Sequence, residues 1–490
     1  MSTNTDFVSA TELAAQIRRG DLSPVDAVEE CLERLEERND RTNAFVSVLE
    51  SEARERAKQA EKELQSGEPV GPLHGVPIAI KDLFDFKAGV PNTMGSKPFE
   101  DFVPDFSATY VERLEEAGAI IVGKTNTPEM GHKGVTDNQL FGPTSTPFDL
   151  DRNAGGSSGG SSAAVADGIV PIAQGSDGGG SVRIPASFCH TVGFKASYGR
   201  VAQAVRPDAF GSHTPYIHAG PITRTVDDAA LMLDVMCGPH PRDPMSAPDD
   251  NPEFQEAVTQ GVEGLSIAYS PDLDCFAIDE RVQTVARDAV HDFEEAGATV
   301  DEIEIGWGVT QEELAQLWLR EIAVLNHSSA MGFAEMGIDI LEDHRDELSS
   351  EYRELLEQTI DMSMREHKRD EHRRTEIFDA VQDVFVEYDL LVTPTLSVPP
   401  VPNDNNGDGE TLGPATVDGT EVERTIGWCL THPINFTGHP AASVPGGLTD
   451  GGLPVGLQLI GDRYDDETVF AAAGALERVR PWHDTYPLQG

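Results

Sequence analysis

The amino-acid sequence predicts an α/β protein with a central β-sheet and helices on its faces. Short apolar segments typical of buried strands, at 76–80, 119–122 and 169–174, alternate with helical segments at 107–117 and 158–167. Such alternation is typical of a sheet against which helices pack. With 490 residues, of which 39% are hydrophobic, the chain is long enough to bury a large core.

The rest of the chain continues this pattern. The first 70 residues predict three helices, and the first helix begins at a capping box formed by Ser9 and Glu12. Residues 310–387 are mostly helical in pattern, whereas 396–420 are rich in Pro, Gly, Asn and Asp and predict a long loop. Further strands are predicted at 265–269, 298–305, 390–394, 441–445 and 454–460, and further helices at 279–296 and 465–478.

The charge is strongly acidic. Asp and Glu number 85 against 36 Lys and Arg, which gives a formal net charge of −49. The acids are dispersed along the chain, and this favours adaptation to a high-salt cytoplasm over an acidic surface for a basic partner. Bulk charge of this sign argues against nucleic-acid binding.

Other features of the sequence narrow the class of protein. No run of 18 apolar residues predicts a membrane span, and the N-terminus lacks the basic and apolar regions of a signal peptide. The five cysteines are odd in number and scattered, without metal-ligand spacing. We therefore expect neither a disulfide framework nor a zinc site, and a reducing cytoplasm fits best.

Residues 155–183 are the segment with the strongest functional signal. Two Gly/Ser clusters flank an apolar spacer, and flexible linkers do not carry such a spacer. In the second cluster, Asp177-Gly-Gly-Gly-Ser181, consecutive glycines can turn backbone N–H groups toward one point beside the Ser181 hydroxyl. Acyl transfer needs this combination of nucleophile and oxyanion donors. A phosphate site is disfavoured because neither phosphate-binding glycine motif is present, and a tight structural turn is the plainer alternative.

A serine nucleophile needs a base, and Lys81 is a candidate. It ends the predicted strand 76–80, and burial lowers the pKa of a lysine far enough for it to accept a proton. Ser157, 24 residues before Ser181, could relay that proton. The alternative for Lys81 is a surface lysine at the end of a strand.

A second hydrolase arrangement also fits the first cluster. Gly155-Gly-Ser157-Ser-Gly159 matches the Gly-x-Ser-x-Gly pattern of a nucleophile elbow, which is weakly specific in a Gly/Ser-rich segment. Asp389 with His432 or His439 could complete an esterase triad around Ser157, although no context singles these residues out.

These motifs resemble the amidase signature family. The likeness extends over most of 70–230 and 385–480, in blocks that follow one another in order. The blocks are Leu-His-Gly-Val-Pro-Ile-Ala-Ile-Lys-Asp (73–82), Gly-Lys-Thr-Asn-Thr-Pro-Glu (123–129), Gly-Pro-Thr (142–144), Gly-Gly-Ser-Ser-Gly-Gly-Ser (155–161), Gly-Ser-Asp-Gly-Gly-Gly-Ser-Val-Arg-Ile-Pro-Ala (175–186), Gly-Phe-Lys (193–195), Gly-Pro-Ile-Thr-Arg-Thr (220–225), Asp-Leu-Leu-Val-Thr-Pro (389–394) and Gly-Leu-Pro-Val-Gly-Leu-Gln (452–458).

The resemblance implies a Ser-Ser-Lys triad on a mixed sheet surrounded by helices. By position, Ser181 is the nucleophile, Ser157 the bridging serine and Lys81 the base. The backbone N–H groups of Gly178, Gly179, Gly180 and Ser181 match the oxyanion hole. The implied reaction cleaves a small-molecule amide to a carboxylate and ammonia or an amine through an acyl-enzyme, with no cofactor and no metal.

No shift in composition clearly divides the chain, which favours one domain over 1–490. Within it we expect a helical N-terminal region (1–70), a signature core (71–230), a helix-rich insertion (231–384) and the C-terminal part of the core (385–490). The oligomeric state stays open, with a homodimer as one possibility.

The family contains stand-alone amidases and the A subunit of the tRNA-dependent amidotransferase. The amidotransferase protein usually has Asp-Thr-Gly-Gly-Ser at 177–181, Asn-Met-Asp-Glu-Phe at 126–130 and Ser-Leu-Asp-Gln-Ile-Gly-Pro in the block that ends at 221. This chain departs from all three, which favours a stand-alone amidase. Ala154 replaces a usual proline, and we expect this to loosen the turn without removing a reactive group.

Several neighbouring residues are given supporting roles. Asp177 and Arg183 are expected to form an ion pair that supports the glycine nest, the turn of residues 178–181 whose N–H groups converge. The alternative is a solvated ion pair that contributes little to stability. Ser158 is the rival of Ser157 as the bridge, and Asp82 could accept a hydrogen bond beside the lysine. Trp428, Phe436 and His432 are candidates for an acyl pocket or, equally, ordinary core residues.

Overall fold

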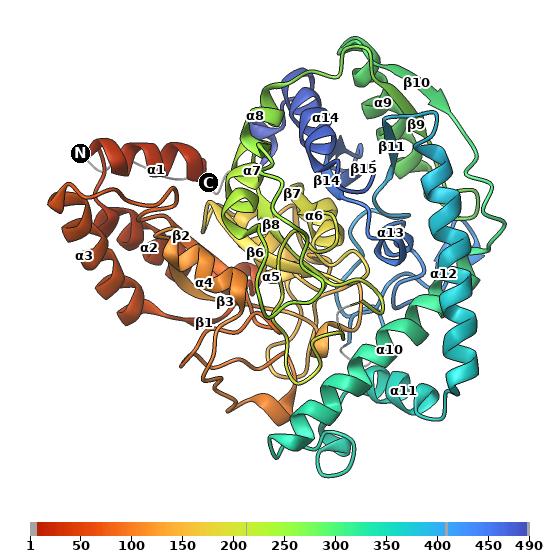
Figure 1. Ribbon diagram of the computed structural model, residues 1–490, viewed down its shortest axis with the longest axis horizontal. Helices are drawn as coiled ribbons and strands as arrows, with labels where there is room; N and C mark the ends of the chain where they lie inside the picture. Colours follow the sequence, from red (N-terminus) through yellow and green to blue (C-terminus); the bar gives the residue numbers. More distant parts are fainter. Residues whose placement is uncertain (1–6, 212, 407–409, 488–490) are drawn as a thin grey trace.

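A mixed sheet of eleven strands forms the centre of the molecule (Figure 1). The computed structural model describes residues 7–211, 213–406 and 410–487. In the order in which they pair across the sheet, the strands are β1 (Phe45–Val48), β3 (Ile120–Thr125), β2 (Pro77–Lys81), β6 (Ile172–Asp177), β8 (His218–Thr223), β7 (Val192–Lys195), β14 (Ala441–Leu448), β15 (Pro454–Gly461), β11 (Leu390–Pro394), β9 (Ser266–Tyr269) and β10 (Thr299–Glu302).

The strand directions confirm the mixed α/β sheet. Strand β2 runs parallel to both β3 and β6, and β9 runs parallel to both β10 and β11. The other pairings in this sheet are antiparallel. Two short hairpins lie outside it, β4 (Ser145–Thr146) with β5 (Asp149–Asn153) and β12 (Thr416–Val417) with β13 (Thr420–Glu421).

Helices cover the sheet and project beyond it at both ends. The N-terminal helices lie at one end of the molecule and α12 lies at the other (Figure 1). The helices are α1 (Ala10–Arg19), α2 (Pro24–Thr42), α3 (Glu50–Ser66), α4 (Thr109–Glu116), α5 (Gly159–Ala166), α6 (Arg183–Cys189), α7 (Val226–Met236), α8 (Phe254–Thr259), α9 (Glu280–Glu295), α10 (Gln311–Glu335), α11 (Ser350–Thr359), α12 (Met364–Val384), α13 (His432–Thr437) and α14 (Asp466–Val479).

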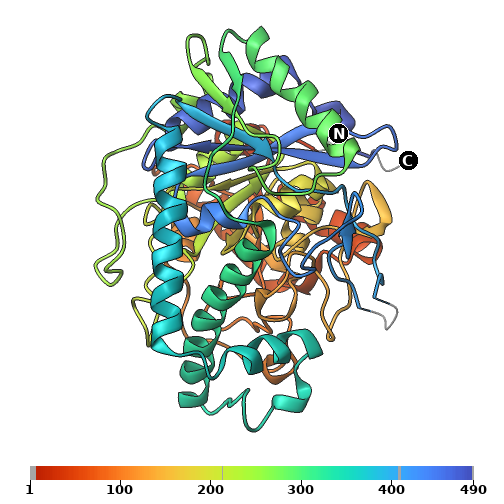
Figure 2. The same ribbon diagram turned by 90° about the vertical axis from the view of Figure 1, so that its right-hand side faces the viewer.

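Two of the expected regions contain strands of the central sheet. Strand β1 lies within 1–70 and pairs with β3, and β9 and β10 lie within 231–384 and extend the far edge of the sheet. Strands β9 and β10 therefore divide the helices of the insertion: α7 and α8 precede β9, and α10, α11 and α12 follow β10. Helix α10 packs against both α11 and α12 (Figure 2).

The spacer between the two Gly/Ser clusters forms a helix and a strand, as the sequence predicts. Helix α5 is buried along its whole length, and its small side chains allow close packing: a Cβ on Gly160 would lie 2.3 Å from the Asn126 nitrogen. Strand β6 begins at Ile172, three residues later than predicted. Pro171 precedes it and has no amide hydrogen to donate to a ladder, so the strand starts after it.

No helix in the described ranges 7–211, 213–406 and 410–487 is both long and apolar enough to span a membrane.

Candidate active site

Lys81 is fully buried at the end of β2. Its Nζ donates hydrogen bonds to Ser157 Oγ at 2.7 Å and to Ser176 Oγ at 3.1 Å. Burial lowers the pKa of Lys81 to about 8, although Asp85 and Asp177 act in the opposite direction. The alternative of a surface lysine is therefore wrong. A lysine with this pKa is partly neutral at ordinary pH and can accept a proton.

The two Gly/Ser clusters meet in space. The Ser158 amide donates to the Ser181 carbonyl at 3.1 Å, so the chain returns through α5 and β6 to its starting point. The Ser158 hydroxyl donates to the Ser176 carbonyl and accepts from the Ser176 amide, both at 3.3 Å. Ser157 is therefore the serine of this cluster that contacts Lys81. Ser181 is half-buried, and its hydroxyl has no hydrogen-bond partner among the described residues.

Two side chains fix the peptide planes of the glycine nest. Trp318 Nε1, from α10, donates to the Gly178 carbonyl at 2.8 Å. Thr431 Oγ1 donates to the Gly179 carbonyl at 2.6 Å. Because a peptide N–H points away from the C=O of the same plane, these bonds turn the N–H groups of Gly179 and Gly180 away from Trp318 and Thr431.

One of the four predicted oxyanion donors is already engaged. The Gly180 N–H donates to Asp177 Oδ1 at 2.8 Å. The N–H groups of Gly178, Gly179 and Ser181 have no partner within the described part of the chain, so these three donors are free.

The nest has no room for a side chain. Gly180 has a φ of +122°, and a Cβ there would lie 1.9 Å from Thr431 Oγ1. A Cβ on Gly179 would lie 2.6 Å from Trp318 Nε1. Gly180 is therefore required by both backbone conformation and close contact, and Gly179 by close contact.

Asp177 and Arg183 form a buried ion pair directly behind the nest. Both side chains are fully buried, and Arg183 donates through Nε and Nη2 to the two Asp177 oxygens at 2.9 Å each. Burial alone would raise the pKa of Asp177, but the Arg183 guanidinium overcomes this and holds that pKa well below its usual range. The remaining Arg183 donors bond the Thr431 carbonyl at 3.1 Å, Gln458 Oε1 at 2.5 Å and Asn435 Oδ1 at 2.6 Å. The expected ion pair is therefore not a solvated surface pair.

Asp82 is also buried, so it is not an exposed carboxylate beside the lysine. It accepts hydrogen bonds from the Thr93 amide and hydroxyl. Burial raises the pKa of Asp82 to about 6, whereas the Lys124 ammonium acts to lower it. Lys124 is itself fully buried, and burial lowers its pKa to about 8.

The residues suggested for an acyl pocket all lie in the core. Trp428 is fully buried and stacks on Phe188, with 5.6 Å between ring centroids. His432 Nδ1 lies 2.8 Å from the Cys429 carbonyl, and burial lowers the pKa of His432 to about 3. Phe436 is 2% exposed. Their assignment to a pocket stays a prediction.

The esterase arrangement around Ser157 does not form. Asp389 accepts a hydrogen bond from the Ser266 amide at 2.8 Å, and His439 Nε2 lies 3.2 Å from Gln382 Oε1. His432 contacts the Cys429 carbonyl as described above, and Ser157 contacts Lys81. Within the residues that the structure describes, no histidine bonds Ser157.

Sequence reasoning missed several residues of the site. Ser176 lies inside the block 175–186, but nothing in that block marks its hydroxyl as a partner of Lys81. Trp318 and Thr431 come from segments remote in sequence, and no local pattern identifies them. Ala154, by contrast, is marked in the sequence as the replacement of a usual proline: its amide donates to the Thr144 carbonyl at 2.9 Å, a bond that proline would lack.

The chain matches the family model for amidases over residues 26–470. The protein belongs to the amidase signature family. It is an amidase, a hydrolase of carbon–nitrogen amide bonds.

The similar proteins are stand-alone enzymes as well as amidotransferase components. The amidase is 38% identical to an acylamidase of Rhodococcus erythropolis, with 99% of this chain and 98% of that protein covered. It is 41% identical to a bacterial aryl acylamidase of known structure, with a TM-score of 0.95 and coverage of 99% and 100%. The A subunit of the glutamyl-tRNA(Gln) amidotransferase of Geobacillus thermodenitrificans is 36% identical, with 98% and 99% covered. The likeness is therefore greater to the stand-alone acylamidases.

The buried ion pair makes a prediction about stability. We expect Asp177→Asn to lower the free energy of unfolding by about 3–5 kcal/mol, because it leaves the buried Arg183 charge without its partner. Equilibrium urea unfolding measures this change. Glu12→Gln is the matched control, because Glu12 pairs with Arg19 at 3.2 Å where both side chains are about half exposed. Equal losses in the two variants would contradict a special role for the buried pair.

Proposed function

We propose that this amidase hydrolyses a carboxylic amide through a Ser181–Ser157–Lys81 triad and an acyl-enzyme. The observation that carries the proposal is the 2.7 Å hydrogen bond between buried Lys81 and Ser157, beside a nest with free N–H donors next to Ser181. A neutral lysine, a relay hydroxyl and a nucleophile with adjacent donors are the groups that acyl transfer requires.

In the first half-reaction, neutral Lys81 takes the proton of Ser157 as Ser157 takes the proton of Ser181. Ser181 Oγ then forms a bond to the amide carbonyl carbon, and the developing oxyanion accepts hydrogen bonds from Gly178, Gly179 and Ser181. The C–N bond breaks when the proton returns from Lys81 through Ser157 to the leaving nitrogen. Water then attacks the acyl-enzyme by the same relay and releases the carboxylate.

We propose an acylamide as the substrate class, with N-acyl arylamines as the first members to test. The support is the likeness to an acylamidase and to an aryl acylamidase over nearly the whole chain. A panel of aliphatic, aromatic and amino-acid amides, assayed in molar salt for release of ammonia or amine, tests this class. Hydrolysis confined to glutamine would argue against it.

The amidotransferase A subunit is the second candidate function, because the chain is 36% identical to such a protein over almost its full length. In that role the site would release ammonia from glutamine for a partner that acts on charged tRNA. Co-purification with partner proteins, together with glutaminase activity that requires them, would favour this function over a stand-alone amidase.

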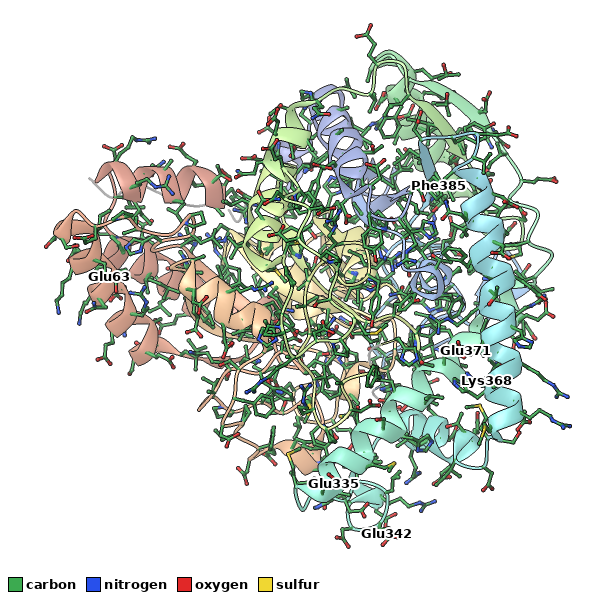
Figure 3. All side chains as sticks on the ribbon, in the orientation of Figure 1. Glu63, Glu335, Glu342, Lys368, Glu371 and Phe385 are labelled. Atoms are coloured by element: carbon green, nitrogen blue, oxygen red, sulfur yellow. The ribbon has the colours of Figure 1, made fainter. Side chains whose placement is uncertain are left out.

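We propose a salt-rich, reducing cytoplasm as the compartment. All five cysteines are free, which fits a reducing environment. The acidic residues extend over the whole molecule: Figure 3 shows Glu63 on α3 at one end, and Glu335 and Glu342 at the end of α10 and beyond it. A dispersed negative surface is stable where salt screens its self-repulsion.

The triad makes the first functional prediction. We expect Ser181→Ala to lower kcat by roughly 10⁴-fold or more, because no other group replaces the nucleophile, and we expect Ser157→Ala and Lys81→Met to remove most activity. Release of amine measures the rates, and far-ultraviolet circular dichroism checks that each variant is folded. A fluorophosphonate probe mapped by mass spectrometry provides the decisive readout. Labelled Ser181 supports the triad, whereas labelled Ser157 without Ser181 would contradict it.

The pKa of Lys81 makes a prediction about pH. Lys81 must be neutral to act as the base, so kcat/KM is expected to rise with pH through a midpoint of about 8 and then to level off. An initial-rate profile between pH 6 and 10 measures this limb. A rate that is independent of pH across this range would contradict a lysine base.

The charge makes a prediction about salt. We expect the urea midpoint to rise between 0.1 M and 2 M KCl, because the screening length falls from about 10 Å to about 3 Å or less and weakens the repulsion within a chain of net charge −49. NaCl at equal ionic strength should act alike if screening is the cause. A midpoint that stays flat or falls would exclude salt adaptation.

A further inference from the structure

Asp85 is a buried carboxylate that the reaction described above does not use. It lies four residues after Lys81 and is fully buried. Its Oδ1 accepts hydrogen bonds from the Tyr110 hydroxyl at 2.7 Å and from Gln174 Nε2 at 2.6 Å. Its Oδ2 is buried without any hydrogen-bond partner in the described structure. Buried polar atoms are almost always paired, so this free oxygen requires an explanation.

Gln174 joins Asp85 to the catalytic lysine. The Lys81 backbone N–H donates to Gln174 Oε1 at 3.3 Å, and the amide nitrogen of the same side chain donates to Asp85. Gln174 lies on β6 and Lys81 on β2, which are neighbouring parallel strands. The carboxylate is thus held in a fixed position relative to Lys81. No hydrogen bond joins Lys81 Nζ directly to Asp85 in the described chain, so the two charges interact through space.

Two other buried carboxylates lie in this region. Asp82 and Lys124 each shift the pKa of the other toward the charged form. Asp177 faces Lys81 but is paired with Arg183. The Lys124 ammonium also donates to the Asp85 backbone carbonyl at 2.5 Å, a bond that leaves the carboxylate oxygens free. The Asp85 carboxylate raises the pKa of Lys124 as well as that of Lys81, but no cation donates a hydrogen bond to either of its oxygens in the described structure.

The reaction changes the charge of Lys81. When the proton of Ser181 has passed through Ser157, a neutral amine has become an ammonium in a site without solvent contact. Charging a buried amine is strongly unfavourable unless a fixed opposite charge stabilises it. Asp85 acts in this direction, because it raises the pKa of Lys81 against the effect of burial.

We propose that Asp85 is the counter-charge of Lys81, a positioning residue whose unpaired oxygen stabilises the ammonium formed during proton transfer. The proposal rests on the proposed function, in which Lys81 is the base. Tyr110 and Gln174 hold the carboxylate, and the free Oδ2 provides negative charge that no neighbouring donor neutralises. A carboxylate with a purely structural role would affect folding and leave the titration of Lys81 unchanged.

The test compares the pH dependence of Ser181 labelling by a fluorophosphonate in the wild-type amidase and in Asp85→Asn. Loss of the negative charge makes the ammonium harder to form. We therefore expect the midpoint of the acidic limb to shift to lower pH by about one unit. The labelling rate on the plateau above that midpoint should fall by about tenfold. Because only folded molecules react at Ser181, the pH dependence of the rate constant can be measured on a preparation in which a fraction of the variant is folded.

Two further variants separate charge from structure. Tyr110→Phe removes one hydrogen bond from Asp85 and keeps the charge of Asp85, so the midpoint of the acidic limb in this variant should not shift to lower pH. Asp82→Asn removes a buried carboxylate that faces Lys124, and its limb should stay at the wild-type midpoint. A limb that is unmoved in Asp85→Asn, or a downward shift of equal size in Tyr110→Phe, would overturn the proposal.

The wild-type data separate this proposal from the proposed function. If wild-type Ser181 is not labelled, or is labelled without an acidic limb, the triad itself is wrong. If the wild-type limb is present and only Asp85→Asn fails to move it, the triad stands and the counter-charge is rejected.

Discussion

The buried ion pair between Asp177 and Arg183 is the constraint on which the site depends. Asp177 ends β6, and its carboxylate takes the Gly180 N–H as well as two Arg183 donors. Arg183 in turn reaches Gln458 on β15 and the Thr431 carbonyl, and the Thr431 hydroxyl holds the Gly179 carbonyl. One charge pair thus ties the central sheet to the nest. Because neither side chain is exposed, salt in the solvent screens this interaction weakly.

Much of the fold and of the candidate site could be predicted from the sequence, because local signals mark them. Strand β11 occupies 390–394 as predicted, and α5 and β6 return the first cluster to the second. Lys81 could be found because it ends an apolar strand. The site also depends on contacts between segments that no local pattern records: Trp318 lies 140 positions from Gly178, and its helix carries no catalytic motif. The engagement of the Gly180 N–H by Asp177 is likewise visible only in three dimensions.

The helical insertion takes part in the site as well as adding to the surface. Helix α10 carries Trp318 to the Gly178 carbonyl, and the Ser349 amide, just before α11, donates to Glu129 at 2.8 Å. Glu129 also binds the Ser96 hydroxyl, so it connects the insertion to two loops of the core. The orientation of the Gly178 peptide is therefore set partly by a region in which the sequence has no recognisable catalytic signal.

The positions of the buried basic residues have a consequence for the outside of the molecule. Lys81, Lys124 and Arg183 belong to a small set of basic residues, and all three are enclosed in the core. Each basic residue in the interior is one that the surface lacks. The buried carboxylates of Asp82, Asp85 and Asp177 lie in the same region, so the interior is close to charge balance while the acidic excess remains on the outside. Mobile cations from the solvent are then the neutralising layer for the outside, whereas the reaction centre keeps its own fixed charges. Salt can thus change the stability of the whole molecule and leave the proton transfers that we propose at Ser181 largely unaffected.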